Sequence, residues 1–282
     1  MSSYKSFALF GAGTIGVPIL NALVANKASV VLFTRPDSAP KANLPSSVKI
    51  VKVDFSDAGA VAAALKEHQV DVVLSTLTTT AAGAQQSLVE AAKRANVKLF
   101  VPSEYGMPTE GHSQGPLGDK NRTAESLKAA GIPYVRFFTG NFIEFAPWLT
   151  SFDAEKKKFT ITGTGNVPGS FTSIGDIAAF VAHVLTTLPP SELENRIFRL
   201  EGERATLNEV AKQFGATVDY VDAVPGDDGH IKTWLLGELE SGGASAGWNA
   251  AKKAEGTGVD AAGSGNEAWP GKFKSIKEVH GL

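Results

Sequence analysis

The sequence has no cysteine, and its five histidines are scattered along 282 residues. Without cysteine, the chain has no disulfide framework, no thiol nucleophile and no cysteine-ligated metal. No two histidines have the H-x-x-x-H spacing of a helical metal site, so we expect no bound metal.

Long hydrophobic runs and a strong net charge are also missing. No apolar stretch approaches the roughly 20 residues that a membrane-spanning helix needs, and the N-terminus lacks the basic segment and apolar core of a signal peptide. The formal charge of −2 gives no electrostatic reason to expect nucleic acid or an anionic membrane as a partner. A cytoplasmic protein is therefore the default expectation, as a monomer or a homodimer.

The first forty residues carry the most specific pattern. An apolar run over residues 4–10 is typical of a buried strand, and a glycine-rich segment and an apolar helical pattern follow it. This is a G-x-G-x-x-G loop between a strand and a helix, which binds a dinucleotide. The first glycine permits the tight turn, the second lets a pyrophosphate approach the backbone, and the third lets the helix pack on the strand, while the helix N-terminus offers N–H groups to the phosphates. The predicted phosphate-binding residues are Gly11, Gly13, Thr14, Ile15 and Gly16.

The end of the second predicted strand, residues 29–33, indicates which dinucleotide binds. A site that prefers NAD usually carries Asp or Glu there to hold the ribose 2′-hydroxyl. This chain has Arg35 instead, with Lys41 nearby. A guanidinium can grip a 2′-phosphate with paired hydrogen bonds, so we predict NADP(H) as the cofactor. The alternative is a solvated arginine beside a glycine-rich turn.

Beyond residue 40, strand and helix patterns alternate, which is typical of a parallel sheet with helices on both faces. A Rossmann-type doubly wound α/β domain is expected over residues 1–140. A smaller substrate-binding lobe is expected over residues 141–282, partly interleaved with the sheet. The segment 242–265, rich in Gly, Ala and Ser, is expected to be a flexible flap or a disordered loop. Predicted strands also cover residues 48–53, 71–75, 98–101, 134–138, 159–162, 197–200 and 217–221, and predicted helices include 118–130, 176–188 and 207–214. Asp57 is expected to cap a helix after the third strand, and Gly131 to end the helix over 118–130. Thr206 and Glu209 have the spacing of a capping box at the start of the helix over 207–214.

Ligands of such a sheet bind beyond the carboxyl ends of its strands, which selects further candidates. Asp54 and Phe55 either flank the adenine or end a strand. Residues 76–78 either line the nicotinamide ribose or begin a helix. Aromatic residues after the sixth strand either form a substrate wall or pack as an amphipathic helix. The cofactor candidates at these strand ends are Thr34, Arg35, Asp54, Phe55, Thr76, Leu77, Thr78, Ser103, Glu104 and Asn141, and the aromatic candidates are Phe142, Phe145, Trp148 and Phe152.

The sequence contains four short motifs in this order: DVVLS at 71–75, PSEYG at 102–106, GIPY at 131–134 and GNF at 140–142. With them, residues 4 to about 180 resemble the NmrA-like group of atypical short-chain dehydrogenases. That group includes the isoflavone reductase-like and phenylcoumaran benzylic ether reductase-like enzymes. The C-terminal third matches only loosely.

The resemblance implies a catalytic lysine at the start of the helix after strand five, where Lys120 stands. An ordinary short-chain dehydrogenase would have a tyrosine four residues earlier, where this chain has Pro116. Lys120 would donate a proton as hydride arrives from the nicotinamide, or hold the nicotinamide ribose. A partly desolvated lysine with a lowered pKa suits the first role. The alternative is a surface lysine in the first turn of a helix.

Two positions depart from the family pattern. Phe10 stands where the family often has the first glycine of its loop. The three glycines that are present still allow the tight turn that dinucleotide binding needs. Tyr105 replaces a phenylalanine common in the reductases. Its hydroxyl either contacts substrate or donates a second proton, or its ring simply packs. Lys120 and Tyr105 are therefore the catalytic candidates, and Tyr105 is also a substrate candidate.

The resemblance favours an NADPH-dependent reductase of a small hydrophobic substrate, aromatic or conjugated in character. Two alternatives remain open. One is an NADP(H)-sensing regulator that binds the dinucleotide without turnover and reports to a partner protein. The other is an enzyme that uses the same scaffold for a non-redox reaction.

Overall fold

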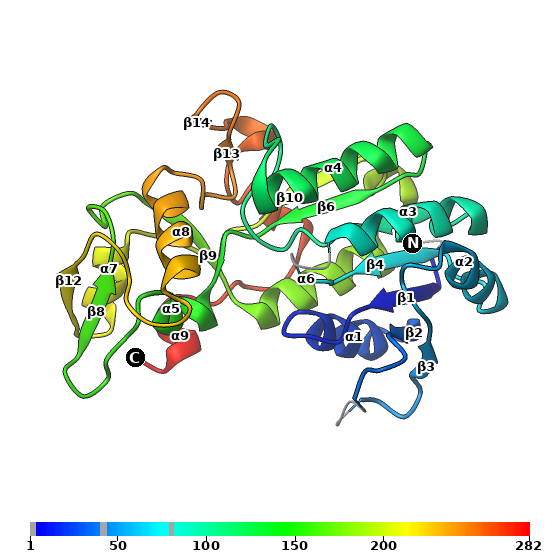
Figure 1. Cartoon of the computed structure of the whole chain (residues 1–282), viewed down its shortest axis with the longest axis horizontal. Coiled ribbons are helices and arrows are strands. Elements are labelled where there is room, and N and C mark those ends of the chain that lie inside the picture. Colours follow the sequence, from blue (N-terminus) through cyan, green and yellow to red (C-terminus); the bar gives the residue numbers. More distant parts are fainter. Residues whose placement is uncertain (1–3, 40–43, 79–81) are drawn as a thin grey trace. The chain divides into compact units, whose positions relative to one another are not determined.

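The computed structural model of the chain describes residues 4–39, 44–78 and 82–282, so Lys41 lies outside the described residues. The chain divides into two compact units (Figure 1). A segment beyond the predicted boundary at residue 140 belongs to the first unit, and the sequence prediction had allowed for interleaving of this kind. Unit 1 comprises Met1–Glu104, Gly111–Arg136 and Ile177–Ile197, and unit 2 comprises Tyr105–Glu110, Phe137–Asp176 and Phe198–Leu282.

Unit 1 is built on a five-stranded parallel sheet in the order β3-β2-β1-β4-β5. The first strand lies in the middle, and Phe10 at its end is level with Phe33 on one side and Ser75 on the other. This is the doubly wound arrangement that the strand–helix alternation predicted, so the predicted fold class is confirmed. The strands are β1 (Ser6–Phe10), β2 (Ser29–Thr34), β3 (Lys49–Lys52), β4 (Val72–Ser75) and β5 (Leu99–Val101).

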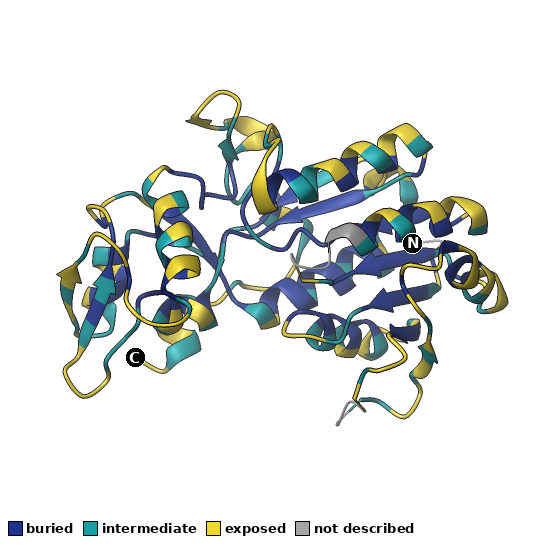
Figure 2. Cartoon of the chain, viewed as in Figure 1, coloured by how far each residue is buried: buried dark blue, intermediate teal, exposed yellow. Residues whose placement is uncertain are grey.

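Strands β1, β2, β4 and β5 of this sheet are largely apolar and buried, as expected where helices cover both faces, whereas the edge strand β3 is mostly exposed. Figure 2 shows the central strands buried and the outward sides of the helices exposed. Asp57 caps the second helix as the sequence predicted, by accepting a hydrogen bond from the Ala60 N–H. The helices are α1 (Gly16–Ala25), α2 (Ala58–Glu67), α3 (Ala82–Ala95), α4 (Gly115–Ala130) and α6 (Ile174–Thr187).

Helix α4 starts earlier than its sequence pattern indicated. The prediction began at residue 118, whereas the helix begins at Gly115 with Pro116 in its first turn. Proline fits there because its fixed φ is helical and the first N–H groups of a helix have no intrahelical partner. The prediction of the start was therefore wrong, and Lys120 lies in the second turn. The predicted end is confirmed, because Gly131 caps the helix in the left-handed region with φ +68°.

Unit 2 contains a three-stranded sheet in the order β11-β9-β7 and a parallel pair, β8 with β12. The capping box predicted for Thr206 and Glu209 is present at the start of α7. The unit's strands are β7 (Asn141–Phe142), β8 (Lys158–Ile161), β9 (Gly169–Thr172), β11 (Glu203–Ala205), β12 (Thr217–Tyr220), β13 (Trp248–Asn249) and β14 (Ala254–Glu255), and its helices are α5 (Ala146–Leu149), α7 (Leu207–Gln213), α8 (Gly229–Glu240) and α9 (Ile276–His280).

Two strands run from one unit into the other. β6 (Val135–Phe138) pairs with β10 (Arg196–Arg199) in a two-stranded sheet. Just before β6, Tyr134 makes a parallel bridge to Phe100 of β5, so the chain continues the order of the unit 1 sheet at that point.

The segment 242–265, for which the composition allowed a flap or a disordered loop, has regular structure and buried residues. It contains the antiparallel pair β13 and β14, and Ala244 and Ala246 at its start are fully buried. The Ala244 carbonyl accepts a hydrogen bond from the Ser170 N–H of β9, and the Ala246 N–H donates to the Ser170 hydroxyl. Small side chains here allow close backbone approach to a strand, which composition alone does not distinguish from flexibility.

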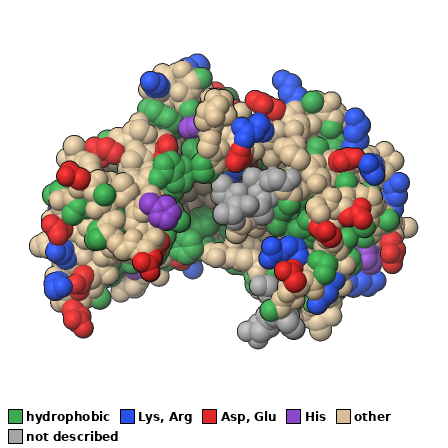
Figure 3. All heavy atoms as spheres, in the orientation of Figure 1, with side chains coloured by type: hydrophobic (Ala, Val, Ile, Leu, Met, Phe, Trp, Pro, Cys, Tyr) green, Lys and Arg blue, Asp and Glu red, His purple; other side chains and the backbone are tan. Residues whose placement is uncertain are grey.

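The surface agrees with the near-neutral composition. On the face seen in Figure 3, Lys and Arg side chains are interspersed with Asp and Glu. No helix within the described ranges is both long and apolar enough to cross a membrane.

Candidate cofactor and catalytic site

The three glycines of the loop between β1 and α1 meet different surroundings. Gly11 has φ +100°, and a Cβ there would lie 3.0 Å from the Thr76 carbonyl oxygen. A Cβ on Gly16 would lie 2.5 Å from the Thr76 hydroxyl and overlap the Gly11 carbonyl. A Cβ on Gly13 would meet nothing within 4 Å. Gly11 and Gly16 are therefore required by the fold, whereas Gly13 borders open space that a phosphate group fits.

Thr76, at the end of β4, holds the glycine loop in place. Its hydroxyl donates toward the Gly11 carbonyl at 2.8 Å and the Phe10 carbonyl at 3.1 Å. Its N–H also donates to the Phe10 carbonyl, at 2.8 Å. The side chain of Thr76 thus supports the preceding loop, and the predicted place of residues 76–78 beside the nicotinamide ribose stays a prediction.

Replacing Thr76 with valine keeps the side-chain volume and removes the hydroxyl. Because the loop carbonyls would lose a buried hydrogen bond, we expect Thr76→Val to lower the free energy of unfolding by about 1–3 kcal/mol. Urea denaturation measures the change. Thr14→Val, on an exposed loop residue, is the matched control, and an equal loss in both variants would contradict the role of Thr76.

The carboxyl ends of β2 and β4 carry buried hydroxyls that suit a polar ligand. Within the described residues, neither the Thr34 hydroxyl nor the Ser75 hydroxyl has a hydrogen-bond partner. Arg35 follows Thr34 and is open to solvent, with its Nε 3.8 Å from an Asp37 carboxyl oxygen. An exposed guanidinium beside the end of β2 can turn toward a phosphate. Together with the open space at Gly13, these groups fit a dinucleotide.

Asp54 and Phe55 lie side by side in sequence but in different surroundings. Asp54 is exposed and accepts hydrogen bonds from the Ser56 N–H and hydroxyl at 2.9 and 2.8 Å, which lower the pKa of its carboxyl. Phe55 is 6% exposed and packs edge-on against Phe10, with ring centroids 5.2 Å apart. Phe10 in turn stacks on Phe33 at 4.6 Å. The ring of Phe55 thus belongs to the core, and its predicted contact with adenine stays a prediction.

The loops after β4 and β5 are tied together. The Ser103 hydroxyl donates to the Leu77 carbonyl at 2.8 Å, and the Ser103 N–H donates to the buried Gln85 side chain of α3 at 3.0 Å. Thr78 is exposed. Sequence reasoning missed Gln85, and a polar residue on the apolar face of a helix is the signal that could have found it.

Lys120 projects from α4 to the loop after β5. Its Nζ donates a hydrogen bond to the Glu104 main-chain oxygen at 2.7 Å. Burial lowers the pKa of the Lys120 ammonium, and the Glu104 carboxylate partly opposes this shift. A lowered pKa suits the proton-donor role that the family resemblance implies for this lysine, and that role stays a prediction.

Glu104 forms a buried ion pair that sequence reasoning missed. Its side chain is fully buried, that of Arg136 in β6 is 5% exposed, and Arg136 Nε donates to Glu104 Oε1 at 2.8 Å. Arg136 stands in the apolar run Val135–Phe138. Because a charge in a buried strand needs a partner, that position could have indicated the pair.

The remaining candidates belong to unit 2. Tyr105 has φ +34°, which is unusual for a residue with a side chain, and its buried ring lies parallel to Phe137 at 6.3 Å. This contact agrees with the packing alternative for its ring. Asn141 in β7 donates from its side chain to the Ser170 carbonyl at 3.4 Å.

The aromatic candidates form a chain of contacts on unit 2. The Phe142 and Phe145 ring centroids are 5.7 Å apart, and those of Phe145 and Trp148 are 6.1 Å apart. Phe145 is 42% exposed and Trp148 39% exposed, so these two side chains are not core residues. Phe152 packs against Phe159 at 5.1 Å, which agrees with the packing alternative for its ring, and a place in the substrate wall stays a prediction.

Two charged side chains contact Trp148: Asp228, which precedes α8, and Lys232, which lies in its first turns. The Trp148 Nε1 donates to an Asp228 carboxyl oxygen at 2.6 Å, which lowers the pKa of that carboxyl. The Lys232 ammonium lies 5.3 Å from the centre of the Trp148 ring, within the range of a cation–π contact.

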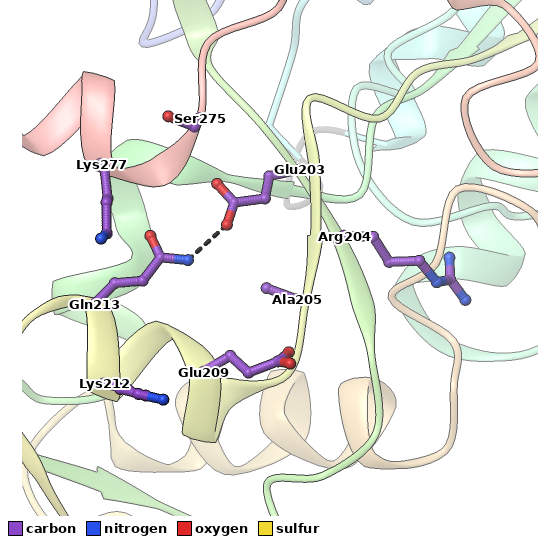
Figure 4. A pocket seen from close by; sticks show the side chains of 8 residues that line it. All are labelled: Glu203, Arg204, Ala205, Glu209, Lys212, Gln213, Ser275 and Lys277. Atoms are coloured by element: carbon purple, nitrogen blue, oxygen red, sulfur yellow. Dashed lines mark hydrogen bonds between the residues drawn. The ribbon is translucent and has the colours of Figure 1, made fainter.

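A cavity of about 550 Å³ lies in unit 2 between β11, α7 and α9 (Figure 4). Both of its carboxylates accept hydrogen bonds from the protein: Glu203 from Gln213 and the Ile276 N–H, and Glu209 from Thr206. None of the predicted site residues lines it. Nor do three His, Cys, Asp or Glu side chains gather into a metal site in the described part of the chain. The candidate chemistry therefore stays with the strand ends and Lys120.

Comparison with known proteins gives consistent similarities. A model of the NmrA-like family matches residues 4–224. The oxidoreductase aprR of Aspergillus flavus is 31% identical over 228 residues, 75% of each chain. Pinoresinol reductase 1 of Arabidopsis thaliana is 34% identical over 201 residues, 61% of this chain and 62% of that protein. The solved complex of leucoanthocyanidin reductase with NADPH from Vitis vinifera has a similar fold, with a TM-score of 0.77 and 20% identity over 98% of both chains.

Proposed function

The chain belongs to the NmrA-like family, and on that premise we propose that it is an NADP-dependent oxidoreductase. Its reaction is the reduction of a small hydrophobic substrate, aromatic or conjugated, by hydride transfer from NADPH. The observation that carries this proposal is the partly desolvated Lys120 ammonium at the end of the sheet. The names of its relatives, an oxidoreductase and a pinoresinol reductase, support the reaction class.

The dinucleotide would be held along the carboxyl ends of β1 and β2. The backbone at Gly13 and the N-terminus of α1 would face the pyrophosphate, and Arg35 would pair with the 2′-phosphate. Thr34 would donate or accept a hydrogen bond with its buried hydroxyl. When bound, NADPH supplies the hydride.

Lys120 would act as the proton donor. Negative charge develops on the substrate atom that accepts the electron pair, and an ammonium with a lowered pKa can release its proton to that atom. Alternatively, Lys120 would hold the nicotinamide ribose by hydrogen bonding. Tyr105 would contact the substrate or donate a second proton. In unit 2, the exposed rings of Phe145 and Trp148, with Phe142 beside them, would offer an apolar wall to an aromatic substrate.

Calorimetric titration with NADPH and NADH in parallel tests the proposal. We expect clear heat of binding with NADPH and much weaker binding of NADH. Phenolic and enone compounds can then be screened for NADPH oxidation by the loss of the absorbance of the reduced nicotinamide. Binding without turnover of any compound would favour the NADP(H)-sensing regulator, and no binding of either nucleotide would overturn the proposal.

The side chain of Arg35 provides a sharper test of the cofactor. Arg35→Ala should weaken NADPH binding by about 10–100-fold and leave NADH binding nearly unchanged, because a charged hydrogen bond to the 2′-phosphate contributes about 1.5–3 kcal/mol. Isothermal titration measures both constants. Arg122→Ala, on an exposed arginine of α4, is the control. Equal losses for the two nucleotides would remove the role of Arg35 at the 2′-phosphate.

A further inference from the structure

The buried ion pair of Glu104 and Arg136 calls for an explanation other than stability. Glu104 is fully buried and Arg136 nearly so. Removing two charges from water is costly, and replacing a buried ion pair with apolar side chains is often neutral or stabilising. A pair of this kind beside a candidate acid therefore suggests that it sets the position and charge of that acid.

The contacts of the pair lead to Lys120 by two routes. On the first, Arg136 holds the Glu104 carboxylate at 2.8 Å, and the main-chain oxygen of the same Glu104 accepts the hydrogen bond from Lys120 Nζ at 2.7 Å. On the second, Arg136 Nη2 lies 3.5 Å from Oδ1 of Asn121, the residue that follows Lys120 on α4. The Asn121 side chain also donates to the His112 carbonyl at 3.2 Å. Arg136 thus connects the acceptor of the Lys120 hydrogen bond with the helix that carries Lys120.

From these contacts we propose that Arg136 is a positioning residue for Lys120 and acts through the buried carboxylate of Glu104. Its guanidinium fixes Glu104 so that the main chain of that residue, rather than its carboxylate, receives the Lys120 ammonium. It also compensates the negative charge of Glu104, which leaves the Lys120 proton available for transfer. The catalytic meaning of this inference rests on the proposed function.

The charged groups around Lys120 support this assignment. Glu104, at the end of β5, raises the pKa of Lys120 against the larger effect of burial. Arg136 faces Glu104 from β6. On α4 itself, the neighbouring charges Asp119 and Arg122 pair with each other. Without the guanidinium, the Glu104 carboxylate would act more strongly on Lys120 and would hold its proton more tightly.

Titration of the Lys120 side chain by NMR in the full-length protein tests the inference without a substrate. The Cε resonance is followed in ¹³C-lysine-labelled protein and assigned by its loss in Lys120→Met. We expect Arg136→Gln to raise the titration midpoint of Lys120 by about one pH unit, a tenfold change in proton affinity. The double variant Glu104→Gln/Arg136→Gln removes both charges and should bring the midpoint back toward that of the parent protein.

Two further variants complete the test. Arg136→Lys keeps the charge and should shift the midpoint less than Arg136→Gln. Lys128→Gln, on an exposed lysine of the same helix two turns beyond Lys120, should not shift it. An unchanged midpoint in Arg136→Gln, or the same shift in the double variant as in Arg136→Gln, would overturn the inference.

A rate measurement distinguishes a failure of the positioning role of Arg136 from a failure of the proposed catalytic role of Lys120. NADPH oxidation is followed with benzylideneacetone as an aromatic enone probe. If Arg136→Gln shifts the midpoint while Lys120→Ala retains full turnover, the positioning role stands and the catalytic role of Lys120 fails. If Lys120→Ala loses turnover and Arg136→Gln leaves the midpoint unmoved, only the positioning role fails.

Discussion

Lys120→Ala is expected to lower kcat by about 10²–10⁴-fold, the usual contribution of a positioned proton donor. The Lys120 ammonium hydrogen-bonds to a main-chain oxygen and has a pKa lowered by burial. Nothing in the Ala variant replaces that proton source, so the chemical step should slow. Binding of NADPH should remain, because the glycine loop and Arg35 are unchanged. Steady-state kinetics and calorimetry measure the two effects separately.

The pH dependence of the same reaction gives a second readout. A proton donor must be protonated, so the rate should fall as pH rises through the Lys120 pKa, which burial places below its ordinary value. That limb of the profile should disappear in Lys120→Ala. Lys128→Ala, an exposed lysine of the same helix, is the control and should keep both kcat and the profile. Unchanged turnover in Lys120→Ala would move the proton donor to another residue.

Gly13→Val is expected to abolish dinucleotide binding while the protein stays folded. A Cβ at Gly13 would meet nothing within 4 Å in the protein, so the free energy of unfolding should change by only about 0.5 kcal/mol, as for other surface positions. The added side chain would instead occupy the space that a pyrophosphate needs beside the backbone. Calorimetry with NADPH and urea denaturation test the two expectations.

Gly16→Ala is the comparison variant, because this substitution is expected to lower the stability of the fold, unlike Gly13→Val. A Cβ on Gly16 would lie 2.5 Å from the Thr76 hydroxyl and overlap the Gly11 carbonyl. The loop must shift, and we expect a loss of about 1–3 kcal/mol of stability, typical of overpacking. Retained NADPH binding in Gly13→Val would mean that the glycine loop has only a structural role.

The sequence predicted the parts of the fold that depend on local pattern. Alternating strand and helix signals gave the parallel sheet of unit 1, and short-range capping signals placed Asp57 and the Thr206 box correctly. These succeed because each depends on residues a few positions apart. The start of α4 was missed because the predicted helix began at residue 118 and left out Pro116, although proline is well suited to a first turn.

The sequence indicated less about which segments meet. Phe152 follows the other aromatic candidates closely in sequence, yet it packs against Phe159. The segment 242–265 has the composition of a loop, yet its start is buried against Ser170 of β9. In both cases the partner is supplied by a different strand, which neither periodicity nor composition identifies.

The sequence by itself determined the fold class and the chemistry of the candidate site: a glycine loop between strand and helix, an arginine where NAD sites carry an acid, and a lysine after the fifth strand. Only the tertiary structure decided which side chains support them. Thr76 holds the glycine loop from β4, and Arg136 reaches the Glu104 carboxylate from β6. The physical reason is that local pattern depends on neighbouring residues, whereas a buried hydroxyl or charge is paired with whatever group folding brings within hydrogen-bond distance.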